Sequence, residues 1–174
     1  MMDRNSRVGV VGVGVMGSAI ATRLLERGHR LWLRDADAGK TEPLVARGAV
    51  AAVSAESLAR EVDYVITSLN TAEIVERDVF GPQGIVVGAA ADKLLIMSSI
   101  DPKATAAMAA QLESATGMAW VDAPLSGGAP AALEGRLTLM LGGTAAAVER
   151  ARPVLAEFAT NITWARAAPA RPPR

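Results

Sequence analysis

Short apolar runs alternate along this chain with longer stretches in which apolar residues recur every three or four positions. The short runs are rich in β-branched residues and predict buried strands, whereas the longer periodic stretches predict amphipathic helices. Strands that alternate with helices in this way are typical of βαβ units. We therefore expect an α/β fold, doubly wound, with a mainly parallel sheet that helices cover on both faces.

The predicted elements follow from this pattern. Strands are expected at Arg7 to Val11, Arg30 to Arg34, Ala49 to Val53, Asp63 to Thr67, Leu94 to Ser98, Ala119 to Asp122, Leu137 to Leu141 and Ile162 to Trp164. Helices are expected at Val15 to Arg27, Gly39 to Arg47, Ser57 to Glu61, Thr71 to Asp78, Pro102 to Ala115 and Ala145 to Phe158. Asp101 and Thr144 are predicted N-caps, Gly117 a helix end, and Pro153 should kink or divide the last helix.

A glycine-rich loop stands between the first predicted strand and the first predicted helix. It consists of Gly12, Val13, Gly14, Val15, Met16 and Gly17. In a dinucleotide site the first glycine permits a tight turn, the second lets backbone approach the diphosphate, and the third lets helix and strand pack closely. The anionic diphosphate then rests against amides at the helix N-terminus. The loop therefore predicts a Rossmann-type domain that binds NAD or NADP.

An acidic residue, Asp35, closes the second predicted strand at about the 20-residue separation that dinucleotide sites show. Its carboxylate would accept hydrogen bonds from the adenosine ribose hydroxyls, and its charge would repel a 2′-phosphate. Arg34 and Lys40 are the counter-evidence, because either side chain could meet an extra phosphate. We interpret both as solvated surface residues. The predicted cofactor is therefore NAD, with NADP as the alternative.

A second glycine-rich motif consists of Asp122, Ala123, Pro124, Leu125, Ser126, Gly127 and Gly128. A further segment of the same motif extends from Gly135 to Gly143. At the end of a strand, Ser126 and the two glycines offer a hydroxyl and exposed amides to a carboxylate. An ordinary glycine-rich turn explains the same residues equally well. From chemistry alone both interpretations stay open.

Together the two motifs resemble the β-hydroxyacid dehydrogenases, a family that includes 3-hydroxyisobutyrate dehydrogenase, tartronate semialdehyde reductase and 6-phosphogluconate dehydrogenase. The resemblance extends from Arg7 to about Thr163. It implies an NAD(P)-dependent oxidoreductase that transfers hydride between nicotinamide and a small 3-hydroxy acid. It also implies that Ser126, Gly127 and Gly128 hold the substrate carboxylate.

The resemblance further implies cofactor contacts by Leu69 and Asn70 after the fourth strand, by Ser99 after the fifth, and by Met16 near the nicotinamide. Asn70 stands where the family usually has proline, and Ser99 stands where threonine is frequent. The family's catalytic lysine has no counterpart, because the stretch from Trp164 to Arg174 contains neither glycine nor lysine.

The remaining titratable side chains do not replace that lysine. Lys40, Lys93 and Lys103 match no family motif, and we interpret Lys93 and Lys103 as decorating a solvated face. His29, the only histidine, is expected near the C-terminal dipole of the first helix. Because loss of a general base costs about a hundred- to ten-thousand-fold in rate, we expect cofactor binding with negligible catalysis.

The chain is expected to form one dinucleotide-binding domain over residues 1–164, followed by an Ala/Arg/Pro tail at 165–174 that is disordered or a truncation scar. The family's C-terminal helical domain is missing from these residues. We expect its loss to expose apolar surface on the final strands and helix. A homodimer, or a chain that supplies the helical domain, would cover that surface.

Composition narrows the function classes. With 18 basic and 18 acidic residues scattered along the chain, there is no electrostatic stripe for nucleic acid. The absence of cysteine excludes disulfides and thiolate metal sites, and the carboxylates show no metal-ligand spacing. No apolar run approaches the length of a membrane span, and the polar N-terminus does not resemble a signal peptide. We expect a soluble, cytoplasmic protein.

Several interpretations of function stay open. The first is the cofactor domain of a β-hydroxyacid dehydrogenase whose chain is incomplete. The second is a naturally short NAD(P)-binding module without catalysis. An imine-reductase-like enzyme would share the cofactor loop but usually differs around the substrate segment. A nucleotide-dependent methyltransferase would also use a glycine-rich first loop, but the segment from Ser126 to Gly128 argues against it.

Overall fold

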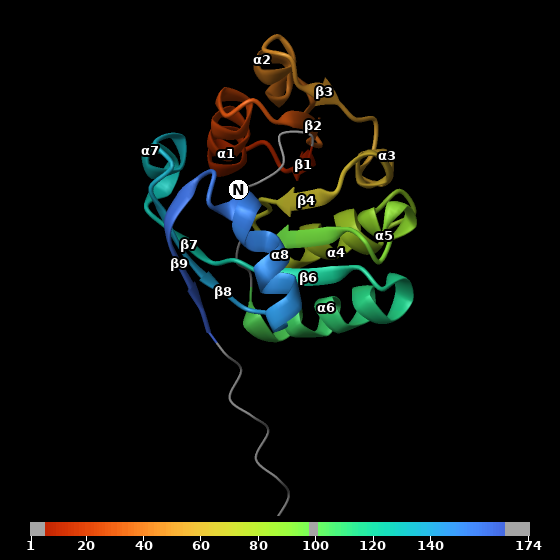
Figure 1. Ribbon diagram of the computed structural model, residues 1–174. Coiled ribbons are helices and arrows are strands. Elements are labelled where there is room, and N and C mark those ends of the chain that lie inside the picture. The colour runs from red at the N-terminus through yellow and green to blue at the C-terminus, as the bar shows by residue number, and fades with distance from the viewer. Residues whose placement is uncertain (1–5, 98–100, 166–174) are drawn as a thin grey trace, which may run out of the picture.

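The computed structural model describes residues 6–97 and 101–165, and the strands in this part of the chain form two sheets (Figure 1). The larger sheet is parallel throughout, with the strand order β3-β2-β1-β4-β5-β6. Its strands are β1 (Arg7–Val11), β2 (Arg30–Arg34), β3 (Val50–Ala51), β4 (Tyr64–Thr67), β5 (Leu94–Met97) and β6 (Ala119–Asp122). The order reverses between β1 and β4, which creates the crevice where α/β sheets bind ligands.

Helices cover both faces of this sheet, as the alternating pattern predicts. They are α1 (Val15–Glu26), α2 (Glu42–Val45), α3 (Ala55–Glu61), α4 (Ala72–Phe80), α5 (Ile85–Gly88), α6 (Pro102–Thr116), α7 (Gly128–Leu133) and α8 (Ala145–Leu155). On one face α1 and α8 bury Ile20, Leu24 and Val148 in a common cluster. On the other face α3, α4 and α6 bury Leu58 and other apolar side chains (Figure 1). The doubly wound prediction is confirmed.

The last predicted strands do not join the main sheet. They form a second sheet with the order β7-β8-β9, made of β7 (Leu125–Ser126), β8 (Leu137–Leu141) and β9 (Ala159–Trp164). β8 pairs antiparallel with β7 and parallel with β9. The backbones of Asp122 and Gly142 exchange hydrogen bonds of 2.9 and 2.8 Å, which joins the two sheets. β6 ends before Pro124 because proline has no N–H for a sheet ladder.

Several predicted bounds agree with the structure, and the differences have local causes. β1, β2, β6 and β8 have the predicted bounds. The helix expected from Gly39 to Arg47 is split into a 3-10 turn (Ala38–Lys40) and α2, because Pro43 fits only in the first turn of a new helix. The structure adds α5, β7 and α7, which the pattern did not predict. α8 continues through Pro153 and ends at Leu155, so the expected division of this helix is wrong.

The predicted helix caps are confirmed. Asp101 accepts a hydrogen bond of 3.1 Å from the backbone of Ala104 at the start of α6. Gly117 ends that helix with a φ of 73°, a left-handed conformation that favours glycine. Thr144 accepts from the backbone of Ala147 at 3.3 Å and begins α8.

Lys93 differs from its prediction as a solvated residue. Its ammonium group donates hydrogen bonds to the carbonyl oxygens of Arg60 (3.1 Å) and Val62 (2.6 Å), at the C-terminal end of α3. A cation at this place satisfies carbonyls that the helix leaves unpaired. Lys103 is exposed, as predicted.

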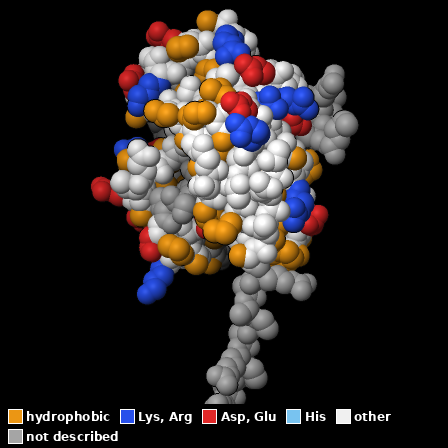
Figure 2. All heavy atoms as spheres, turned by 90° about the vertical axis from the view of Figure 1, so that its left-hand side faces the viewer, with side chains coloured by type: hydrophobic (Ala, Val, Ile, Leu, Met, Phe, Trp, Pro, Cys, Tyr) orange, Lys and Arg blue, Asp and Glu red, His pale blue; other side chains and the backbone are white. Residues whose placement is uncertain are grey.

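The final strands and helix carry both polar and apolar side chains on their outer surface. Thr160, Asn161 and Thr163 are exposed on β9, while Met140 on β8 is an apolar exception with 59% exposure. Viewed from the side of α7 and the second sheet, hydrophobic side chains form small separate groups (Figure 2). On α8 the exposed residues include Ala145 and Ala146 beside Glu149 and Arg150, so the expected apolar surface on these elements stays a prediction. None of the described helices is long and apolar enough to cross a membrane.

A cluster of Arg27, His29 and Glu157 ties the C-terminal end of α1 to the loop after α8. The backbone N–H of His29 donates to the carbonyl of Leu24 at 3.1 Å, so His29 lies at the helix end, as predicted. Its buried Nε2 lies 3.4 Å from a carboxylate oxygen of Glu157, and Arg27 donates to the other oxygen at 2.8 Å. Burial alone would raise the pKa of Glu157, but the hydrogen bond from Arg27 and the nearby His29 lower it below its ordinary value.

We expect Glu157→Gln to cost about 1–3 kcal/mol of folding free energy at pH 7, because Arg27 and His29 lose a charged acceptor. A carboxyl group whose pKa is lower in the folded state stabilises the fold above its unfolded pKa, and this contribution disappears as the pH falls through the folded pKa. The gap between wild type and variant should therefore shrink below about pH 4. Urea unfolding at pH 7 and pH 3.5 measures it, and a gap that stays constant would contradict the assignment.

Candidate dinucleotide site

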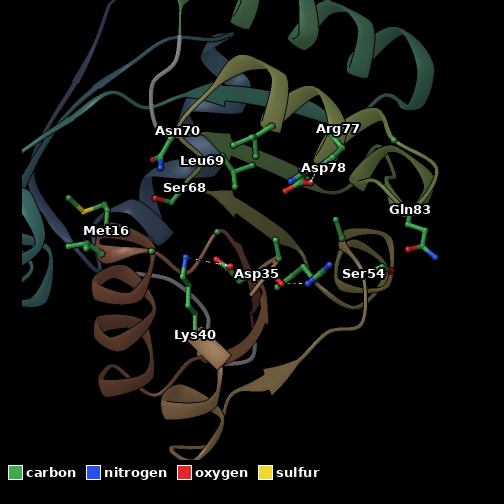
Figure 3. A pocket seen from close by; sticks show the side chains of 18 of the residues that line it. Met16, Asp35, Lys40, Ser54, Ser68, Leu69, Asn70, Arg77, Asp78 and Gln83 are labelled. Atoms are coloured by element: carbon green, nitrogen blue, oxygen red, sulfur yellow. Dashed lines mark hydrogen bonds and ion pairs between the residues drawn. The ribbon is translucent and has the colours of Figure 1, made fainter. Parts of the chain in front are cut away.

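A cavity of about 840 Å³ lies at the carboxyl ends of β1, β2 and β4, where the strand order reverses (Figure 3). Its size is typical of a site for a ligand as large as a cofactor. The glycine loop, the end of β2, the segment before α3 and the segment from β4 through α4 all contribute to it. The lining residues are Gly12, Gly14, Val15, Met16, Arg34, Asp35, Ala36, Lys40, Ser54, Ala55, Ser68, Leu69, Asn70, Ile74, Arg77, Asp78, Gly81, Pro82 and Gln83.

The first and third glycines of the loop have no room for a side chain. Gly12 has a φ of +92°, and a Cβ there would lie 2.2 Å from the carbonyl oxygen of Ser68. A Cβ on Gly17 would lie 1.9 Å from the carbonyl oxygen of Gly12, so α1 packs directly on the loop. The predicted roles of these two glycines in the turn and in helix packing are therefore confirmed.

Gly14 differs from both, because a Cβ at this position would meet nothing within 4 Å. Its φ of −75° is accessible to any residue, and it lines the cavity as the N-cap of α1. No side chain caps the first turn of this helix, and no acidic residue stands in it. The amides at the start of α1 therefore keep their hydrogen-bonding capacity, and the dipole of α1 favours an anion there.

Asp35 lies beside the glycine loop, with its side chain only 10% exposed. One carboxylate oxygen accepts from the backbone of Val13 at 2.7 Å, and the other accepts from the backbone of Asp37 at 2.9 Å. The Lys40 ammonium group lies 3.9 Å from the carboxylate, and the Arg34 guanidinium donates to the Asp35 carbonyl. Arg34 and Lys40 both line the cavity, and the Lys40 side chain is 50% exposed, so Lys40 is solvated and also borders the site.

Most of the described residues that the family resemblance and the glycine loop place near the cofactor line the cavity, but Val13 does not. Met16, Leu69 and Asn70 line one end of the cavity, away from Ser54 and Gln83 at the other end (Figure 3). Val15 lines it as well, and this residue is 82% exposed. The side chain of Val13 is buried and contributes no lining. Ser99 lies outside the described residues.

Sequence reasoning missed four polar residues that line the far end of the cavity. Ser54 precedes α3, Arg77 and Asp78 lie on α4, and Gln83 follows it. Arg77 donates to the Asp78 carboxylate at 2.9 Å (Figure 3).

The predicted carboxylate-binding residues lie outside this cavity. Ser126, Gly127 and Gly128 are exposed where β7 meets α7, and both glycines have positive φ, 126° and 71°. α7 packs against α1, and Met16 packs against the same apolar cluster as Ala131 of α7. The segment is therefore adjacent to the helix that begins at the glycine loop.

Asp122 opens the motif that contains these residues, at the junction of the two sheets. Its Oδ1 atom is buried and has no hydrogen-bond partner among the described residues. Burial raises the pKa of this carboxyl group, and a hydrogen bond from the Ala123 backbone only partly offsets that effect. Nowhere in residues 6–97 and 101–165 do three His, Asp or Glu side chains gather as metal ligands.

Comparison with known proteins agrees with this geometry. Residues 7–165 match the family model described as the NAD binding domain of 6-phosphogluconate dehydrogenase. The chain is 35% identical to 2-(hydroxymethyl)glutarate dehydrogenase of Eubacterium barkeri over 162 residues, which are 92% of this chain and 54% of the relative. The chain spans about half the length of the curated relatives it matches.

Solved structures give the same result. The structure of Mycobacterium tuberculosis 3-hydroxyisobutyrate dehydrogenase with L-serine superposes with a TM-score of 0.85 at 32% identity, over 92% of this chain and 54% of that one. Psf3 in complex with NADP+ superposes with a TM-score of 0.86 at 27% identity, over 91% and 56%. With the match over residues 7–165 and this cavity, the chain belongs to the NAD-binding domain family of 6-phosphogluconate dehydrogenase and the related β-hydroxyacid dehydrogenases.

Proposed function

We propose that this chain is the cofactor-binding part of a dehydrogenase that acts on a small 3-hydroxy acid. The observation that carries the proposal is the open space at Gly14, beside the amides of α1 and the carboxylate of Asp35. A bulky residue would occupy this space, and a diphosphate fits it by charge and by hydrogen bonding. The residues that line the cavity therefore fit a dinucleotide.

The arrangement of the lining residues supports one orientation of that cofactor. The start of α1 would hold the diphosphate, and Asp35 would accept hydrogen bonds from the adenosine ribose. Met16 and Asn70 would border the nicotinamide, at the end of the cavity away from Arg77 and the other residues of α4 (Figure 3). When bound, the nicotinamide supplies hydride transfer, while the residues named here bind and orient it.

NAD is the proposed cofactor in preference to NADP. The carboxylate of Asp35 would repel a 2′-phosphate, whereas the nearby Lys40 partly offsets that charge. We expect NADH to bind about tenfold more tightly than NADPH, a difference of about 1.4 kcal/mol. Lys40→Met should widen the preference, because it removes the cation and leaves the carboxylate.

Fluorescence titration of the 174-residue chain with NADH and NADPH tests this proposal. Binding of neither cofactor would refute the proposed function, and tighter binding of NADPH would refute the NAD preference. The same sample, given 3-hydroxyisobutyrate and NAD, should show negligible turnover. Measurable turnover would contradict the proposal, argued below, that another segment or chain supplies the group that transfers the proton.

The substrate part of the proposal concerns Ser126, Gly127 and Gly128. Their exposed hydroxyl and amides would hold the carboxylate of the hydroxy acid, near the helix that begins at the glycine loop. Oxidation of the alcohol also needs a group that accepts its proton. Around Met16 and Asn70 the described lining offers the Ser68 hydroxyl and no side chain that titrates near neutral pH. We assign proton transfer to a group that another segment or chain supplies.

A further inference from the structure

We infer that Asp35 is a positioning residue that holds the glycine loop in its binding conformation, in addition to its place beside the ribose. The inference rests on the proposed dinucleotide site and adds a second task to one of its residues. A residue that only recognises ribose would not determine how the protein binds a bare diphosphate. A residue that positions the loop would do so.

Two successive amides of the loop are tied to the end of β2. The N–H of Gly12 donates to the carbonyl of Arg34 at 2.9 Å, and the N–H of Val13 donates to the Asp35 carboxylate at 2.7 Å. The first bond needs only backbone, whereas the second depends on the side chain at position 35. Val13 is buried and does not line the cavity. Because its amide donates to Asp35, that amide is not available to a ligand.

The carboxylate that accepts this bond is itself held in place. Its second oxygen accepts from the backbone of Asp37 at 2.9 Å and lies 3.9 Å from the Lys40 ammonium group (Figure 3). With 10% exposure, the side chain has little freedom to turn away. Asp35 therefore connects the glycine loop with the turn after β2, the two segments between which the cofactor would lie.

The two possible roles predict opposite changes when the carboxylate is removed. An anionic ligand binds more favourably when a nearby negative charge is lost. If Asp35 only recognised ribose, removal of its carboxylate would therefore leave pyrophosphate binding unchanged or make it tighter. A positioning residue would instead release Val13 and let the loop move. Ordering the loop again on binding costs free energy, so pyrophosphate binding would weaken.

The experiment compares Asp35→Ala and Asp35→Asn with the matched control Asp37→Ala. Asp37 is exposed, and its carboxylate accepts from the backbone of Gly39 without contacting Val13, so the control removes the same charge two residues away. NMR measures the amide exchange rate of Val13 in the free protein and the affinity for inorganic pyrophosphate. Thermal unfolding checks that each variant is folded.

We expect Asp35→Ala to speed exchange at Val13 about tenfold and to weaken pyrophosphate binding about threefold, roughly one lost hydrogen bond in each case. Asp35→Asn retains an acceptor oxygen and should keep most of the protection at Val13. Asp37→Ala should leave exchange at Val13 at the wild-type value and leave pyrophosphate binding equal or slightly tighter, because it removes a charge without releasing Val13. Unchanged exchange at Val13 in Asp35→Ala, or pyrophosphate binding that is equal or tighter, would overturn the inference. Failure of the wild type to bind NADH would refute the proposed function alone, because exchange at Val13 is measured without ligand.

Discussion

Replacing Gly14 with leucine should weaken NADH binding by about a hundredfold or more, or about 2.7 kcal/mol, while the protein stays folded. A Cβ at this position meets nothing within 4 Å, and its φ of −75° suits any residue. The cost to folding should be limited to a poorer N-cap, about 1 kcal/mol or less. The leucine side chain would instead extend into the cavity that Gly14 lines and block the diphosphate from the amides of α1.

Calorimetric titration with NADH and thermal unfolding of the same samples measure both halves of this prediction. Gly14→Ala provides a graded control, because its single methyl group blocks less of the cavity and should weaken binding less than leucine does. If the leucine variant binds NADH as tightly as wild type, the diphosphate does not lie against α1, and the proposed orientation of the cofactor is wrong.

Gly17→Ala, in contrast to the Gly14 variant, should reduce folding stability. We expect a loss of about 3 kcal/mol or more in the free energy of unfolding. Within a helix, alanine is normally about 1 kcal/mol more favourable than glycine, so propensity alone predicts stabilisation. Here the added Cβ would lie 1.9 Å from the carbonyl oxygen of Gly12 and 3.3 Å from the Cβ of Ser68. The nearer contact is with backbone, so α1 would have to move away from the loop.

Urea unfolding of Gly17→Ala and of Ser18→Ala tests this contrast. Ser18 is the next residue on α1 and is only partly buried, and its side chain forms no hydrogen bond with the described residues. Its substitution should therefore change stability by less than about 0.5 kcal/mol. A Gly17→Ala protein as stable as wild type would show that the loop and helix are not in the close contact described here.

The three glycines of the loop show how much of the site the sequence predicts. The order of glycines after an apolar strand indicates that one position serves the turn, one the ligand and one the helix, and the geometry at Gly12, Gly14 and Gly17 agrees with this division. The acid at the end of β2 is also found from sequence alone. Its hydrogen bond to Val13 is not, because that bond depends on how β2 lies beside the loop of β1.

Lys40 and Lys93 show which side-chain contacts the sequence does not reveal. Both are of a residue type that is common on protein surfaces, yet Lys40 lies 3.9 Å from the Asp35 carboxylate and Lys93 donates to the carbonyl groups at the end of α3. Lys93 is 31 residues from Val62 in the chain, so no local pattern connects the two. Ser54 and Gln83 escaped notice for the same reason, since only the fold brings them to the cavity that the glycine loop also lines.

By itself, the sequence determined the doubly wound α/β fold, the starts of α1, α6 and α8, and the glycine loop with Asp35. These features depend on the spacing of apolar residues and on backbone sterics within a few positions, and both can be read from neighbouring residues. Only the tertiary structure decided that β7, β8 and β9 form a separate sheet, and that Arg34, Lys40 and α4 border the cavity. The physical reason is that strand pairing and side-chain contacts across a cavity join distant segments through the packing of the whole domain.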